Sequence, residues 1–137
     1  MIGLHRAFAR IPVRAGLLLV ALGSVVVLGA CGWFRSPEPR FEIAGADIER
    51  GRSALIAYGC VACHTVPGVA GPNTYVGPPL DAWAERRYIA GRVANNPDNL
   101  IEWIRFPQAI DPETAMPSLA VSEQDARDIA AYLYTLD

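Results

Sequence analysis

The spacing of apolar residues predicts helices at both ends of the region 46–137. Toward the C-terminus, apolar residues recur three or four positions apart and would share one helical face: Ala126, Ile129, Ala130, Leu133 and Leu136. Ser122, followed by acidic residues, has the pattern of a capped helix start. At the other end, Asp47 can cap a helix whose apolar residues lie at near-helical spacing: Ile48, Leu55 and Ile56.

A third, shorter helix is predicted after Asn96, because Pro97 suits the first helical position and Pro107 would end the helix. Its buried face would consist of Leu100, Trp103 and Ile104. The segments 67–79 and 107–117 are rich in Pro and Gly and read as loops that can curl around a cofactor. No segment of useful length alternates as a strand does, so the pattern predicts an all-α domain.

The first part of the chain has the pattern of an export signal, with arginines and no acid before an uncharged stretch. In one interpretation, residues 1–30 are a leader and Cys31 is acylated, because Leu28-Gly29-Ala30-Cys31 resembles the lipobox of bacterial lipoproteins. In the other, residues 15–34 remain as a membrane helix, since this length just spans a bilayer. Both anchor the protein on the periplasmic side of the bacterial cytoplasmic membrane.

Between this leader and the domain, the polar, proline-containing segment 31–45 is predicted to be an extended tether. At roughly 3.1 Å per residue it would reach on the order of 45 Å from the membrane. Without residues 1–30, nine arginines stand against fourteen acids, a formal balance of 9 − 14 = −5, and the chain has no lysine. This acidic balance argues against nucleic acid as a partner.

The motif Cys60-Val61-Ala62-Cys63-His64 has the spacing of a c-type haem attachment site. Its thiols would bond to one porphyrin edge, and His64 would be the proximal iron ligand. Three other interpretations are open. A thioredoxin-like dithiol would need a βαβ pattern nearby, half a zinc site would need a second pair of ligands, and a disulfide across so short a loop would stabilise little.

Met116 is the candidate sixth ligand, because His5 lies in the leader and Met1 is the initiator. A haem with both axial positions filled by protein transfers electrons and leaves no open site for peroxide or oxygen. The carbonyl of Pro78 is a candidate acceptor for the second N–H of His64. Arg87 and Trp103 are the favoured propionate donors, among a larger set of candidates: Tyr75, Trp83, Arg86, Tyr88 and Arg92.

These motifs, in this order, resemble a class I cytochrome c. The resemblance covers the whole predicted domain and rests on Gly51, Leu55, Cys60 to His64, Gly77-Pro78-Pro79-Leu80, Met116-Pro117 and Ala131-Tyr132-Leu133. The stretch from Asn96 to Trp103, continued by Pro107 to Ile110, is similar to the cytochrome domains of caa3-type oxidase subunit II and to their stand-alone relatives.

The resemblance implies an all-helical fold whose first and last helices cross, and one haem c bound covalently through Cys60 and Cys63. It also implies that His64 and Met116 bind the iron and that Pro78 orients His64. The expected function is that of a membrane-tethered electron carrier without enzyme activity, between a quinol-oxidising complex or dehydrogenase and a terminal oxidase. The alternatives are a peroxidase-type enzyme with Met116 displaced, a cytochrome subunit of a periplasmic dehydrogenase, and a non-redox binding module.

Overall fold

The computed structural model describes residues 40–72, 74 and 76–137. The predicted leader, the alternative membrane helix, Cys31 and Tyr75 lie outside the described residues, as does most of the predicted tether. All described residues belong to a single compact unit. None of the helices in this described part is long and apolar enough to cross a membrane.

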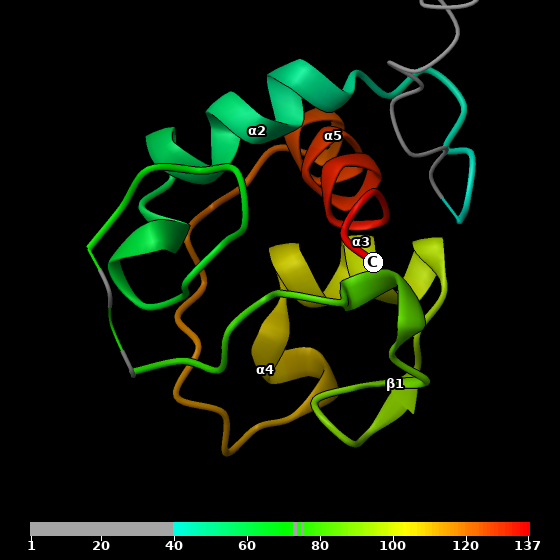
Figure 1. The fold of residues 1–137 in the computed structure, drawn as a ribbon. Helices are drawn as coiled ribbons and strands as arrows, with labels where there is room; N and C mark the ends of the chain where they lie inside the picture. The colour runs from blue at the N-terminus through cyan, green and yellow to red at the C-terminus, as the bar shows by residue number, and fades with distance from the viewer. Residues whose placement is uncertain (1–39, 73, 75) are drawn as a thin grey trace, which may run out of the picture. The chain divides into compact units, whose positions relative to one another are not determined.

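Two helices, α2 (Ile48–Ala57) and α5 (Glu123–Leu133), come from opposite ends of this unit and pack against each other (Figure 1). Both predicted caps are confirmed. The side chain of Asp47 accepts a hydrogen bond from the N–H of Arg50 at 2.9 Å, and Ser122 Oγ accepts one from the N–H of Asp125 at 3.1 Å. These bonds satisfy N–H groups that a helix leaves unpaired in its first turn.

The two helices meet closely at Gly51, which is buried. A Cβ atom at this position would lie 1.9 Å from the carbonyl oxygen of Asp128 in α5. Real Cβ atoms do not approach an oxygen this closely, so only glycine permits this contact between the two backbones. The predicted crossing of the first and last helices is thereby confirmed.

A buried carboxylate reinforces the contact between α2 and α5. Asp128 is fully buried, yet its oxygens accept hydrogen bonds from the N–H of Asp47 at 2.8 Å and from Gln124 Nε2 at 3.0 Å. The guanidinium of Arg50 donates two more, at 2.8 and 2.5 Å. Several donors around one carboxylate offset the cost of removing it from water. The sequence pattern alone did not single out Asp128.

Helix α3 (Pro97–Arg105) begins as predicted, because Asn96 Oδ1 accepts a hydrogen bond from the N–H of Asn99 at 3.0 Å. Its buried face is the predicted one, formed by Leu100, Trp103 and Ile104. The structure differs after Arg105, where Pro107 opens a further short helix, α4 (Pro107–Ile110). Proline lacks only an N–H that the first helical turn leaves unpaired, so it can begin a helix as well as end one.

A short antiparallel hairpin joins β1 (Tyr88–Ile89) and β2 (Val93–Ala94) and is the one strand pair among the described residues. The sequence pattern did not predict it, because two-residue strands are too short to show alternation. Its turn places Ala90 at φ 49° and Gly91 at φ 68°, the positive values that a tight hairpin turn requires. Two 3₁₀ turns complete the elements: η1 (Cys60–Ala62) and η2 (Trp83–Glu85).

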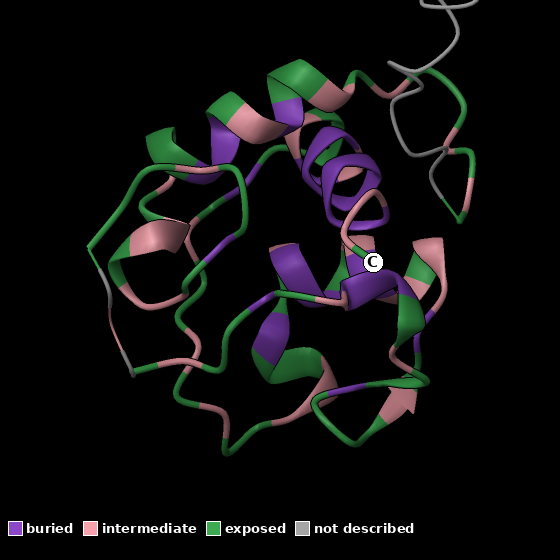
Figure 2. Ribbon diagram, in the orientation of Figure 1, coloured by how far each residue is buried: buried purple, intermediate pink, exposed green. Residues whose placement is uncertain are grey.

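The buried residues lie mainly on the facing sides of α2, α3 and α5 (Figure 2). The end of the predicted tether also contacts this core, since the ring of Phe41 packs edge-on against Tyr134 with centroids 4.8 Å apart. The N–H of Arg40 donates to the carbonyl of Tyr134 at 3.2 Å. Residues 40–43 are therefore part of the folded unit, which shortens any extended tether relative to the prediction.

Candidate functional site

The end of α2 places Cys60, Cys63 and His64 on one turn. Gly59 has φ +74° and donates its N–H to the carbonyl of Ile56 at 3.0 Å, which ends the helix in the usual left-handed way. The 3₁₀ turn follows, and the N–H of His64 donates to the carbonyl of Cys60 at 3.0 Å. Both thiols are free and partly buried, so they are available for bonds to a shared ligand.

The predicted partner of His64 lies beside it. His64 Nδ1 and the carbonyl oxygen of Pro78 are 2.7 Å apart, and this oxygen can only accept a hydrogen bond. The loop carrying Pro78 is held in place by backbone bonds, from Gly77 N to the carbonyl of Cys63 and from Leu80 N to the carbonyl of Thr65, both 2.8 Å. A proton on Nδ1 leaves the Nε2 lone pair free for a metal, with the ring orientation fixed.

Gly77 lies against the imidazole. A Cβ atom here would be 2.5 Å from Cε1 of His64 and 2.7 Å from its Nδ1. The φ value of this glycine is not positive, so space rather than backbone conformation requires glycine at this position. Gly77 belongs to the sequence motif Gly77-Pro78-Pro79-Leu80, but the motif does not indicate this contact.

Replacing Gly77 by alanine should therefore displace the His64 ring and destabilise the protein by about 1–3 kcal/mol. We expect a lower urea midpoint and, for the expected haem in its ferric state, an altered EPR spectrum, because that spectrum depends on the orientation of the axial ligands. Gly71→Ala is the matched control, since its Cβ would lie 2.7 Å from Cβ of Val61 and contact that side chain instead. Equal EPR changes in both variants would contradict a specific contact between Gly77 and the imidazole.

The thiol of Cys60 differs from that of a reactive dithiol. Burial raises its pKa, and the neighbouring Cys63 raises it further, while a backbone hydrogen bond opposes these effects. Catalytic dithiols instead have a lowered pKa, because the thiolate is the nucleophile. This environment argues against the thioredoxin-like interpretation. Among the described residues, no three His, Cys, Asp or Glu side chains gather where they could hold a metal ion.

Met116 is partly buried and packs against the same hydrophobic core as Cys60 and Val61. Its loop is held by side chains, since Gln108 Nε2 donates to the Met116 carbonyl at 2.7 Å and the N–H of Met116 donates to Thr114 Oγ1 at 3.2 Å. Sequence reasoning missed Gln108. Its position in the stretch bounded by Pro107 and Pro117, which also contains Met116, is the signal that could have identified it.

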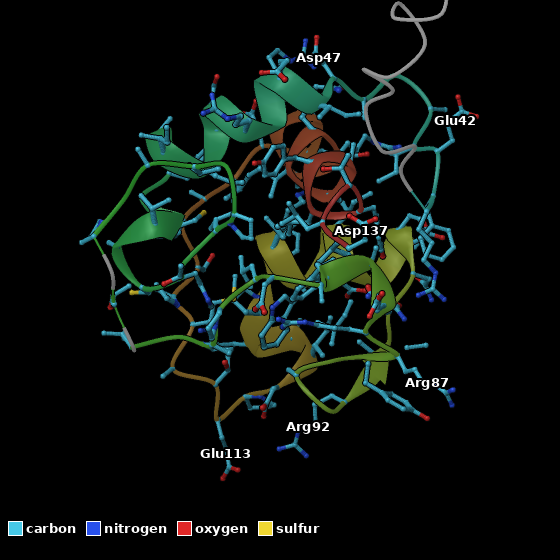
Figure 3. The ribbon with its side chains drawn as sticks, viewed as in Figure 1. Glu42, Asp47, Arg87, Arg92, Glu113 and Asp137 are labelled. Atoms are coloured by element: carbon cyan, nitrogen blue, oxygen red, sulfur yellow. The ribbon has the colours of Figure 1, made fainter. Side chains whose placement is uncertain are left out.

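The two favoured propionate donors lie in different surroundings. Trp103 is buried in α3, with 8% of its surface exposed. Arg87 is exposed and points outward at the edge of the molecule (Figure 3). Two of the other candidates are in contact, because the guanidinium of Arg86 stacks 4.8 Å from the ring of Trp83, whose buried indole N–H has no partner among the described residues. Both favoured assignments stay predictions.

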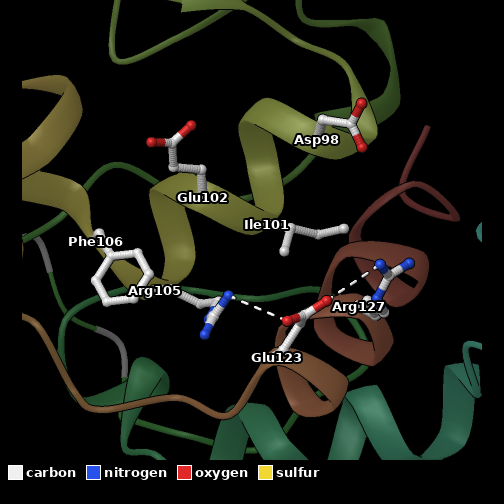
Figure 4. Close-up of a pocket in the computed structure, with 7 residues that line it drawn as sticks. All are labelled: Asp98, Ile101, Glu102, Arg105, Phe106, Glu123 and Arg127. Carbon is white, nitrogen blue, oxygen red and sulfur yellow. Dashed lines mark hydrogen bonds and ion pairs between the residues drawn. The ribbon is translucent and has the colours of Figure 1, made fainter.

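A separate hollow of about 340 Å³ lies between α3 and α5 (Figure 4). Charged side chains dominate its lining, which also includes Ile101 and Phe106: Asp98, Glu102, Arg105, Glu123 and Arg127. The carboxylate of Glu123 lies 3.6 Å from Arg105 and 3.3 Å from Arg127. Such half-exposed ion pairs contribute little stability. None of the residues predicted to hold a haem lines this hollow.

The residues around His64 fit a covalently attached haem. The two free thiols and the oriented imidazole are the donors that such a haem needs on one side, and Gly77 leaves open the space beside the imidazole that a Cβ would fill. The apolar core that Cys60, Val61 and Met116 contact suits a large apolar ring.

Comparison with known proteins agrees with this chemistry. Residues 48–137 match the family described as Cytochrome c. Cytochrome c oxidase subunit 2 of Alkalihalophilus pseudofirmus is 38% identical over 88 residues, 64% of this chain and 25% of that protein, so the chain spans about a quarter of this relative. The fold is similar to that of cytochrome c2 from Rhodobacter sphaeroides, with a TM-score of 0.52, 22% identity, and coverage of 66% of this chain and 96% of that one.

Proposed function

The chain belongs to the cytochrome c family, whose members are electron carriers, and from this premise we propose that it is a mono-haem carrier anchored at the periplasmic face of the cytoplasmic membrane. The observation that carries the proposal is the hydrogen bond between His64 Nδ1 and the Pro78 carbonyl. It orients the imidazole on the turn that also holds both thiols, as axial ligation beside two thioether bonds requires.

In this proposal each residue has a separate task. Cys60 and Cys63 bind the cofactor covalently, His64 supplies Nε2 to the iron and Pro78 fixes the ring. Met116 supplies the second axial ligand. The haem provides one-electron redox chemistry, and a thioether ligand favours its reduced form. With both axial positions filled by the chain, the site does not admit peroxide, which favours a carrier over a peroxidase-type enzyme.

The proposed partners are based on the distribution of charged residues and on the similarity to an oxidase subunit. The sequence has no acidic or basic residue between Arg52 and Asp81 apart from His64, and none between Glu113 and Glu123. These are the segments that carry the proposed haem ligands, so we propose docking through uncharged surface rather than through paired charges. The similarity to an oxidase subunit supports a terminal oxidase as acceptor. The donor would be a quinol-oxidising complex or a dehydrogenase, and the anchor Cys31 lipid or an N-terminal helix.

Intact mass and visible absorption of the full-length protein, extracted from membranes, test this proposal. We expect one haem increment, a six-coordinate spectrum with the Met-to-iron charge-transfer band in the ferric state, and no steady turnover of peroxide. A chain that begins at Cys31 and carries an acyl increment would identify the lipid anchor. The mass of the full-length chain would instead identify the N-terminal helix as the anchor. A protein without haem would contradict the carrier. A ferric form that binds cyanide as an open haem does would favour the peroxidase-type alternative.

A further inference from the structure

Side chains hold the backbone of Met116 on both sides. Its carbonyl oxygen accepts a hydrogen bond from Gln108 Nε2 at 2.7 Å, and its N–H donates to Thr114 Oγ1 at 3.2 Å. We propose that Gln108 is a positioning residue that holds the Met116 thioether on the iron, an inference that rests on the proposed function. It would act through the ligand loop and touch neither cofactor nor partner.

The loop that carries Met116 is irregular, so contacts from side chains contribute to its conformation. Residues 111–122 contain no helix or strand. Ala120 has φ +54°, a left-handed conformation that is unfavourable for a residue with a Cβ. The two hydrogen bonds of Met116 come from side chains and take the place that a ladder of backbone bonds has in regular structure.

Gln108 is well placed to provide this support, because it belongs to a closed helical turn. Pro107 is buried, and its carbonyl accepts a hydrogen bond from the N–H of Asp111 at 2.9 Å, closing α4. The other anchor, Thr114, is joined to the same turn, since its N–H donates to the carbonyl of Asp111 at 3.1 Å. One contact to the Met116 backbone therefore comes from α4, and the other comes from a residue that is hydrogen-bonded to the end of this helix.

A thioether is a weak, uncharged ligand, so the rigidity of its loop helps to decide how often an external ligand can replace it. Loss of the hydrogen bond from Gln108 should increase the fraction of molecules in which Met116 has left the iron. The expected factor is that of one ordinary hydrogen bond, about fivefold. The same factor should appear as tighter apparent binding of any small ligand that competes with Met116.

The test titrates the full-length, haem-loaded ferric protein with imidazole at pH 7. We expect Gln108→Leu to bind imidazole about fivefold more tightly than wild type and to show a weaker Met-to-iron charge-transfer band. Gln108→Glu should behave similarly at pH 7, because an ionised carboxylate cannot donate to the Met116 carbonyl.

Gln124→Leu is the matched control, because Gln124 Nε2 also donates to a backbone carbonyl, that of Gly45, at 3.0 Å. It should lower stability and leave imidazole affinity unchanged. A similar rise in imidazole affinity in this control would overturn the positioning role. So would wild-type affinity in Gln108→Leu while the charge-transfer band is present. Absence of that band from wild type would instead overturn ligation by Met116, and with it the proposed function.

Discussion

Replacing Gly51 by alanine is expected to destabilise the protein by about 3 kcal/mol or more, a large share of the stability of a small domain. On an exposed helix the same change would stabilise by up to about 1 kcal/mol, because alanine is the better helix former. The sign reverses here because the added Cβ would lie 1.9 Å from the carbonyl oxygen of Asp128. The helices must separate, and the buried carboxylate of Asp128 would lose part of its hydrogen bonding.

Urea unfolding of the haem-loaded protein, followed by circular dichroism, measures this loss. Ser53→Ala is the matched control, since Ser53 is exposed on the same helix and gains helix propensity without a new contact. If Gly51→Ala unfolded at the same urea concentration as wild type, or at a higher one, the close contact between α2 and α5 would be wrong.

The helices themselves could be predicted from the sequence, because their signals are local. Asp47, Asn96 and Ser122 each cap a helix as their positions predicted, and all three caps are made by bonds to residues three positions along. The contact between α2 and α5 depends on residues far apart in the sequence, so no periodicity indicates it. Gly51 and Asp128 acquire their roles only when the two helices are brought together.

The candidate site also contains residues that the sequence predicts and residues that it does not. The thiols and His64 belong to one continuous motif, and its spacing alone predicted their chemistry. Pro78 follows fourteen positions later, and its carbonyl was expected beside the imidazole, where the structure has it. Gly77 leaves space beside the imidazole, and Gln108 donates a hydrogen bond to the Met116 backbone. Neither property appears in a pattern of residue types. Arg87 is exposed, which the sequence could not indicate for one of several neighbouring arginines.

Replacing Met116 by histidine is expected to keep the haem six-coordinate and to lower its reduction potential by on the order of 200 mV. Imidazole donates more strongly than a thioether and so stabilises the oxidised iron, whereas a thioether favours the reduced form. Redox titration followed by visible absorption measures the shift, and loss of the Met-to-iron charge-transfer band identifies the ligand exchange.

Ala115→His separates ligation from the mere addition of a histidine to the loop, since Ala115 is exposed and adjacent. Its potential should stay close to that of wild type, with the charge-transfer band retained. An unaltered potential in Met116→His would remove Met116 from the iron while leaving attachment through Cys60 and Cys63 intact. A fall in potential that is confined to Met116→His would instead support Met116 as the axial ligand that raises the potential of the proposed haem.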